Sequence, residues 1–198
     1  AKFRLRKFKG KIIAITGSVG KTSTKEAVYS VLNTAFKVKK SEKSMNSDFG
    51  LLLSILDIES GFFSVTKWGW YLMKGFLHSL RRDYNEILLF EMAVDKPGDM
   101  DFLTSIVKPD IAIITNVFHT HLDNGQFRDL EDIFAEKSKL IKALGAGGKA
   151  VLNLDNPFTA NFARGRNKKD TITYGKDSKA DFWASRVNQS LGGMSFVL

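Results

Sequence analysis

Runs of apolar, often β-branched residues recur along the chain and are separated by segments long enough to form helices. Most of these runs are apolar at consecutive positions, which is typical of strands buried on both faces of a parallel sheet. We therefore expect strands at KIIAIT (11–16), FKVKKS (36–41), EILLFEM (86–92), PDIAIITN (109–116) and GKAVLNLD (148–155).

The segments between these runs predict helices. We expect them at 21–35, 50–57, 99–107 and 127–144, and a short one whose first turn holds Pro157. The alternation predicts an α/β fold, with a mainly parallel sheet flanked by helices. From about residue 171 the pattern alternates more, in TITYG, DFWASRV and MSFVL, which indicates a small antiparallel β addition at the C-terminal end.

Two further segments have an unusual composition. Residues 62–80, FFSVTKWGWYLMKGFLHSL, are rich in aromatic residues but also contain lysines and glycines, so we reject a membrane-spanning helix. We expect a helix packed on the core, with membrane or partner contact as the alternative. Residues 1–11, AKFRLRKFKGK, form a basic N-terminal arm without an acid. A solvated arm is the plain interpretation, and contact with anionic lipid or nucleic acid is the alternative.

Overall composition narrows the classes of protein. A chain of 198 residues, 43% of them hydrophobic, can bury one sizeable core. With no cysteine it has no disulfide framework and no thiolate metal site, and it shows no secretory signal, so we expect a cytoplasmic location. The net charge of +9 and the pI near 9.6 favour anionic partners.

The sequence IIAITGSVGKTSTKE places a glycine-containing turn between a strand and a helix. Backbone N–H groups at such a turn, and the positive end of the helix dipole, attract phosphate. The lysine would reach the outer phosphates and the threonine hydroxyl would hold Mg²⁺. The spacing is a shorter form of the common P-loop. The predicted phosphate-binding residues are Gly17, Ser18, Val19, Gly20, Lys21, Thr22 and Ser23.

Polar residues close other predicted strands at the same edge of the sheet. Glu91 ends one strand, Asn116 ends another and is followed by His121, and Asn153 ends a third. Each has a structural alternative, since Glu91 can pair with a lysine, His121 can be a loop residue, and Asn153 can serve a turn. Together a carboxylate and an imidazole near a triphosphate form a plausible site for a hard divalent cation.

Lys137 occupies an unexpected position in the predicted helix DIFAEKSKLIKAL. At about 100° per residue it falls on one line with Ile133, Leu140 and Leu144, in the middle of the apolar stripe. Such a lysine can extend its stem toward water. Alternatively, it is a desolvated amine with a lowered pKa. A neutral amine can take up CO₂ and become a carbamate, which is an anionic metal ligand.

Several motifs in one order resemble the central, ATP-binding domain of the Mur ligases, which add amino acids to the peptidoglycan precursor. The matching pieces are ITGSVGKTSTKE, EMAVDKPGDM, KPDIAIITNVFHTHLD, AEKSKLI and VLNLDNP, across about 12–157. The first two look most like the type that joins D-alanyl-D-alanine to a UDP-muramoyl tripeptide. We therefore expect a Mur-ligase-like ATP-binding domain over 12–198, with the antiparallel portion from about 171.

The resemblance implies roles for individual residues. The 17–23 loop would cradle the phosphates of ATP, with Lys21 on the outer ones. Thr22 and Glu91 would serve one Mg²⁺, and His121 with a carbamylated Lys137 would serve a second. Lys21, His121 and Lys137 are thus the candidate catalytic residues. The predicted nucleotide contacts outside the loop are Asn46 and Asn116.

The resemblance also implies substrates and partners. The reaction would proceed through an acyl phosphate, and the partners would be a UDP-linked muramoyl peptide and D-Ala-D-Ala rather than nucleic acid. The family's N-terminal UDP-binding domain and its C-terminal domain have no room in this chain, so we expect it to be inactive or weak alone. Two alternatives stay open: the core of a folate or polyglutamate ligase, and a non-catalytic module that binds nucleotide or docks on a membrane.

Overall fold

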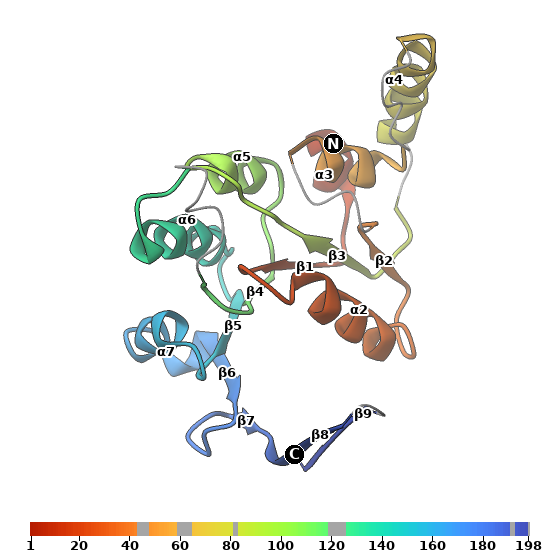
Figure 1. Cartoon of the computed structure of the whole chain (residues 1–198). Helices are drawn as coiled ribbons and strands as arrows, with labels where there is room; N and C mark the ends of the chain where they lie inside the picture. Colours follow the sequence, from red (N-terminus) through yellow and green to blue (C-terminus); the bar gives the residue numbers. More distant parts are fainter. Residues whose placement is uncertain (43–47, 59–64, 81–82, 119–125, 191–192, 198) are drawn as a thin grey trace.

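A parallel seven-stranded sheet forms the centre of the protein in a computed structural model, which describes residues 1–42, 48–58, 65–80, 83–118, 126–190 and 193–197 (Figure 1). Its strand order is β2-β3-β1-β4-β5-β6-β7, and each of these pairings is parallel. The strands are β1 (Lys11–Thr16), β2 (Val38–Lys40), β3 (Ile87–Glu91), β4 (Ile111–Ile114), β5 (Lys149–Asn153), β6 (Thr171–Gly175) and β7 (Phe182–Trp183).

Helices cover both faces of this sheet. They are α1 (Lys2–Lys7), α2 (Lys21–Leu32), α3 (Asp48–Leu56), α4 (Val65–Leu80), α5 (Asp99–Ile106), α6 (Leu130–Lys142) and α7 (Pro157–Arg164), with a 3₁₀ turn at Lys168–Asp170. In Figure 1, α2 lies on one side of the strands, and α5 and α6 lie on the other. The predicted strands and helices up to residue 164 are therefore present, with ends that differ by a few residues.

Strand β1 shows why the apolar runs are continuous. Ile12 and Ala14 pack into the core beneath α3, α5 and α6, whereas Ile13 and Ile15 pack toward α2 on the opposite face. A strand with apolar contacts on both faces must be apolar at every position. The parallel register then places Glu91 opposite Ile15, so that the polar ends of neighbouring strands meet at one edge.

The predicted small antiparallel addition at the C-terminal end is confirmed, but it begins at residue 185 rather than at about 171. β6 pairs parallel with β5, and β7 pairs parallel with β6, so residues 171–183 extend the main sheet. Only β8 (Ser185–Ser190) and β9 (Gly193–Val197) form an antiparallel pair. The alternating pattern of TITYG and the exposed residues of β7 reflect strands near an edge of the sheet, which bury less of their surface.

The basic N-terminal segment contains a short helix that is docked on the fold. Leu5 and Phe8 pack against the main core, and the side chain of Arg4 is buried. One guanidinium nitrogen of Arg4 lies 3.0 Å from Asp83 and 2.6 Å from Asp57. This segment is therefore only partly a solvated arm, because Arg4 holds it against the residues that precede β3.

Replacing Arg4 by methionine tests this anchor. Asp83 would keep a buried carboxylate without its cation, so we expect Arg4→Met to lower the free energy of unfolding by about 3–5 kcal/mol. The exposed Arg6→Met is the matched control, and its effect should stay within about 0.5 kcal/mol. Urea denaturation of both variants measures the difference, and equal effects would show that the Arg4 ion pairs do not hold the segment.

Candidate functional site

The loop between β1 and α2 has the backbone conformation of a phosphate-binding turn. Gly17 has φ 151°, and a Cβ atom there would lie 1.9 Å from Oγ1 of Thr115, so no side chain fits. Gly20 has φ 79° and serves as the N-cap of α2. The loop thus ends directly at a helix N-terminus, where unpaired N–H groups and the helix dipole favour an anion.

Residues that follow β4 hold this loop in place. The backbone N–H of Ser18 donates to the carbonyl of Asn116 at 3.0 Å. The backbone N–H of Val19 donates to the side-chain Oδ1 of Asn116, also at 3.0 Å. Oγ1 of Thr115 donates to the carbonyl of Val19 at 2.8 Å. Asn116 therefore positions the loop. A contact between Asn116 and a nucleotide stays a prediction.

Lys21 lies folded back over the loop. Its Nζ donates to the carbonyls of Gly17 and Ser18, at 3.0 Å in each case. Burial lowers the pKa of Lys21, while the carboxylates of Glu91 and Asp95 act in the opposite direction. The ammonium group is thus held at the centre of the turn by neutral carbonyls and can exchange them for phosphate oxygens.

Glu91 is the buried carboxylate of the site, with 1% of its surface exposed. Oγ1 of Thr22 donates to its two oxygens at 2.9 and 3.1 Å. Nζ of Lys25 lies 3.4 Å from Glu91 and donates to the carbonyl of Ser41 at 2.7 Å. The lysine partner that was the structural alternative for Glu91 is therefore present, and binding of Mg²⁺ by Thr22 and Glu91 stays a prediction.

The sequence reasoning missed Lys25, although a signal for it exists. Lys25 is fully buried in α2, and it shares a face with Val28, Tyr29 and Leu32, which pack toward β1 and β3. These residues follow it at helical spacings of three, four and seven. The helical spacing that predicts an inward Lys137 therefore also predicts Lys25 as a cation that faces the sheet.

Lys137 points into the protein, as the apolar stripe of α6 predicts. Only 2% of its surface is exposed, and among the described residues none accepts a hydrogen bond from its Nζ. The pKa of Lys137 is lowered to about 8, because burial and the nearby charge of Lys21 disfavour its ammonium form more than Asp95 and Glu136 favour it. The charge of Lys21 acts on Lys137, and Asp95 acts on both lysines, so the two side chains face a common region.

Glu136, next to Lys137, was also not predicted. Its Oε1 accepts hydrogen bonds from the backbone N–H groups of Gly98 (3.0 Å) and Met100 (2.8 Å) at the start of α5. Its other oxygen lies 2.6 Å from Nζ of Lys139. Glu136 therefore ties α6 to α5, and this contact fixes the rotation of α6 that turns Lys137 inward.

The LNLDNP segment has a structural role that the sequence left unassigned. Nδ2 of Asn153 donates to the carbonyl of Thr115 at 2.9 Å, and Nδ2 of Asn156 donates to that of Val117 at 3.0 Å. Asn156 also caps α7, since its Oδ1 accepts from Thr159 N–H. These contacts fix the chain after β4, which in turn supports the phosphate loop.

The oxygen ligands at the loop fit Mg²⁺. Over the described ranges, no group of three histidine, cysteine or acidic residues forms a metal cage. Mg²⁺ does not require three such protein ligands, because it is usually held by one or two carboxylates together with phosphates and water. Thr22 and Glu91 supply a hydroxyl and a carboxylate side by side. Asn46 and His121 lie outside the described residues.

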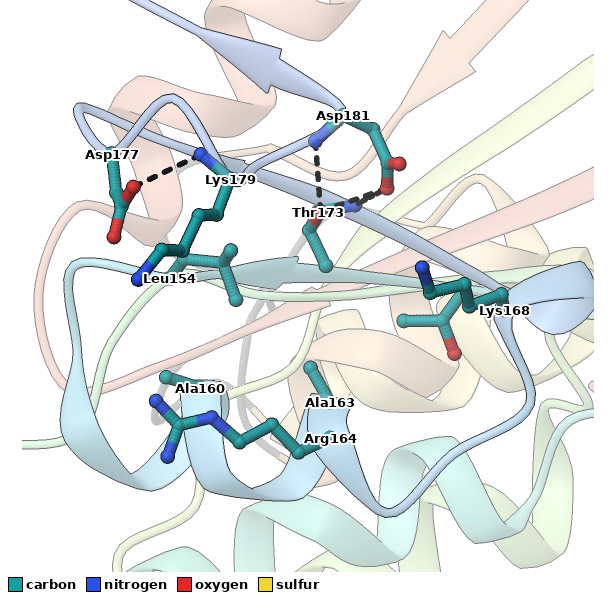
Figure 2. A pocket seen from close by; sticks show the side chains of 10 residues that line it. Leu154, Ala160, Ala163, Arg164, Lys168, Thr173, Asp177, Lys179 and Asp181 are labelled. Carbon is teal, nitrogen blue, oxygen red and sulfur yellow. Dashed lines mark hydrogen bonds between the residues drawn. The ribbon is translucent and has the colours of Figure 1, made fainter.

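A cavity of about 310 Å³ lies away from the phosphate loop, between α7 and the β6–β7 region (Figure 2). Figure 2 shows Arg164, Lys168 and Lys179 around it, with Asp181 hydrogen-bonded to Thr173. None of the predicted phosphate or metal residues lines this cavity.

The lowered pKa of Lys137 predicts a dependence of stability on pH. The folded protein disfavours the ammonium form, so a penalty of about 3 kcal/mol is present below pH 8 and is relieved as the pH rises from 8 to 10.5. In bicarbonate-free buffer, Lys137→Met should therefore raise the free energy of unfolding at pH 7 and flatten its rise over that window. The exposed Lys142→Met is the control, and denaturation at several pH values is the measurement. An unchanged slope in Lys137→Met would contradict the assignment.

Comparison with known proteins identifies the family. The Mur ligase middle domain matches residues 15–198. The UDP-N-acetylmuramoyl-tripeptide–D-alanyl-D-alanine ligase of Borreliella burgdorferi is 40% identical over 141 residues, covering 71% of this chain and 25% of the relative. The enzyme of that name from Bacillus subtilis is 28% identical over 198 residues, covering 100% of this chain and 37% of the relative. The chain thus spans well under half the length of these relatives.

Solved structures agree with this assignment. A MurF ligase from Thermotoga maritima in complex with ADP has a TM-score of 0.73 and 30% identity, covering 98% of this chain and 39% of that one. MurF from Acinetobacter baumannii also has a TM-score of 0.73, with coverage of 98% and 39%, and at 23% identity it supports the fold alone. The chain belongs to the Mur ligase middle domain family.

Proposed function

We propose that this chain is the ATP-binding core of a carboxylate–amine ligase that adds D-Ala-D-Ala to a UDP-muramoyl tripeptide. The observation that carries the proposal is the convergence of Lys21, Glu91 and Lys137 at the phosphate loop of a Mur ligase middle domain. The names of the relatives from Borreliella burgdorferi and Bacillus subtilis support the choice of substrate.

Different residues of the loop would bind the phosphates and the metal ion of a bound triphosphate. Lys21 would leave the carbonyls of Gly17 and Ser18 and pair with the outer phosphates. Thr22 and Glu91 would hold Mg²⁺, which supplies positive charge against the phosphate oxygens. Lys25 stays behind Glu91, 3.4 Å from its carboxylate, and fixes the direction of that side chain, so it is a positioning residue rather than a ligand.

The proposed reaction joins two anions and therefore needs a cationic site. A substrate carboxylate oxygen attacks the γ-phosphorus of ATP, the bond to the bridging oxygen breaks, and ADP leaves. The incoming amine then attacks the acyl phosphate carbon, and phosphate leaves with the bonding pair while the amine loses a proton. Lys21, at the centre of the loop, would stabilise the charge that gathers on the phosphoryl oxygens.

Lys137 would supply a second metal position after carbamylation. Its neutral amine attacks the carbon of CO₂, the nitrogen loses a proton, and a carbamate anion replaces the cation. The lowered pKa supports this step, because a larger fraction of the amine is neutral near physiological pH than for an ordinary lysine. His121 is the proposed partner of this carbamate in metal binding.

The domain assignment is part of the same proposal. Residues 12–198 would be the central domain, and separate domains would bring the UDP-sugar and the dipeptide. We therefore expect weak or no ligation by this chain alone, although it should bind nucleotide.

Nucleotide binding by the chain tests the proposal directly. Calorimetric titration with Mg²⁺·ATP should show one site, and Lys21→Ala should weaken it at least about tenfold, because a charge-assisted contact to phosphate is lost. The exposed Lys142→Ala is the control and should bind like the unaltered chain. Equal affinities of the two variants would rule out the loop as the phosphate site.

The carbamate has its own test. In ¹³C-bicarbonate buffer, the chain should show a slowly exchanging carbamate resonance in the ¹³C NMR spectrum. Lys137→Met should abolish this resonance, and Lys142→Met should leave it unchanged. A resonance that persists in Lys137→Met would assign the carbamate to another amine and remove the second metal position from the mechanism.

A further inference from the structure

Helix α4 has a continuous apolar face that the described protein does not cover. Trp68 and Tyr71 turn toward α3, where they pack with Leu53 and Ile58. The opposite side of the helix is exposed and consists of large apolar side chains at helical spacing: Trp70, Met73, Phe76, Leu77 and Leu80. In Figure 1, α4 projects away from the sheet at the upper right, so this face is accessible along its length.

Helix α1 extends this face with aromatic and basic side chains. Nζ of Lys7 donates to the carbonyl of Leu80 at 3.4 Å and lies 4.1 Å above the ring of Phe3, which is itself exposed. The C-terminal end of α4 therefore adjoins the exposed side of α1. We call the exposed residues of the two helices the α1–α4 surface.

The positive charge of the protein is concentrated in the two segments that carry this surface. Residues 1–11 and 60–82 contain ten of the 30 lysines and arginines and none of the 21 acids. The rest of the chain therefore has 20 cations and 21 acids, and is close to neutral. The whole net charge of +9 belongs to the segments that also carry the exposed apolar face.

Acids next to these segments pair with only some of the cations, and Asp110 pairs with Lys11 at 2.8 Å. Asp83 is buried against Arg4, and Asp57 pairs with both Arg4 and Lys39. Both carboxylates are thus already engaged by cations, although Asp57 keeps 43% of its side chain exposed. The surface presents aromatic and aliphatic groups together with exposed cations such as Lys2 and Arg6, which form no ion pair with another described residue.

We propose that the α1–α4 surface docks on the anionic headgroups of a lipid bilayer, with α4 lying in the plane of the interface. An amphipathic helix with Trp, Phe and Leu on one face and basic residues beside it binds in this way, through apolar burial and attraction to anionic lipid. Among the described helices, none is long and apolar enough to cross a membrane, and α4 has 16 residues. The docking is independent of the phosphate loop.

The positive charge of the α1–α4 surface favours an anionic lipid bilayer over a second copy of the chain as its partner. A symmetric dimer through the α1–α4 surface would bring two strongly cationic segments together, and like charges in contact cost several kcal/mol. An anionic bilayer matches both the sign of the charge and the apolar face.

Vesicle binding by the whole 198-residue chain tests the proposal. Co-sedimentation should be strong with vesicles of phosphatidylglycerol mixed with phosphatidylcholine, weak with phosphatidylcholine alone, and reduced by salt. Phe76→Gln/Leu77→Gln should weaken binding at least about tenfold through lost apolar burial. Phe182→Gln is the matched control, because Phe182 is 64% exposed and Phe76 is 67% exposed, and it should bind like the unaltered chain.

Two further measurements complete the test. Lys2→Gln/Arg6→Gln/Lys9→Gln should lose about fivefold in affinity for each cation removed. In Trp68→Phe/Trp183→Phe, Trp70 is the single tryptophan, and its emission should shift to the blue on binding.

Several outcomes would overturn the proposal. These are equal binding to neutral and anionic vesicles, no vesicle binding, or a dimer that Phe76→Gln/Leu77→Gln dissociates while vesicles are not bound. The affinity for Mg²⁺·ATP should be the same in Phe76→Gln/Leu77→Gln and in the unaltered chain. That measurement separates a failure of the docking proposal from a failure of the ATP site.

Discussion

The buried carboxylate of Glu91 is the constraint on which the site depends. It lies at the carboxyl end of β3, opposite the end of β1, and burial of its charge requires partners. Thr22 and Lys25, both from α2, are those partners. This network fixes α2 against β3, and the helix N-terminus that receives the phosphate loop is thereby fixed relative to the sheet.

The second constraint is a surplus of cations at the same edge. Lys21 is held by the neutral carbonyls of Gly17 and Ser18, and burial lowers the pKa of Lys137. Two buried cations that repel each other are unfavourable unless an anion joins them or one of them loses its charge. A bound triphosphate would supply the anion, and carbamylation of Lys137 would remove one of the two positive charges. The same electrostatic demand thus supports both parts of the proposed chemistry.

Much of this arrangement follows from sequence pattern. KIIAIT forms β1 as expected, because burial on both faces leaves a continuous apolar run, and the stripe of α6 correctly turns Lys137 inward. β6 and β7 were read as antiparallel, because strands near an edge alternate like hairpin strands and local pattern does not determine their partners. Glu136 was not predicted because its partners at the start of α5 are distant in sequence, whereas the inward position of Lys25 follows from its helical spacing to Val28, Tyr29 and Leu32. The sequence pattern thus did not predict which strands β6 and β7 pair with. The roles of Asn46 and His121 stay predictions.

The central claim is that the phosphate loop and Lys137 surround one metal–nucleotide complex. The most direct measurement is paramagnetic broadening of lysine side-chain NMR signals by Mn²⁺·ATP, with the exposed Lys142 as an internal reference. The account predicts that the ε-methylene signals of Lys21 and Lys137 both broaden strongly, while that of Lys142 stays sharp. Broadening of Lys21 without Lys137, or equal effects at Lys137 and Lys142, would contradict it.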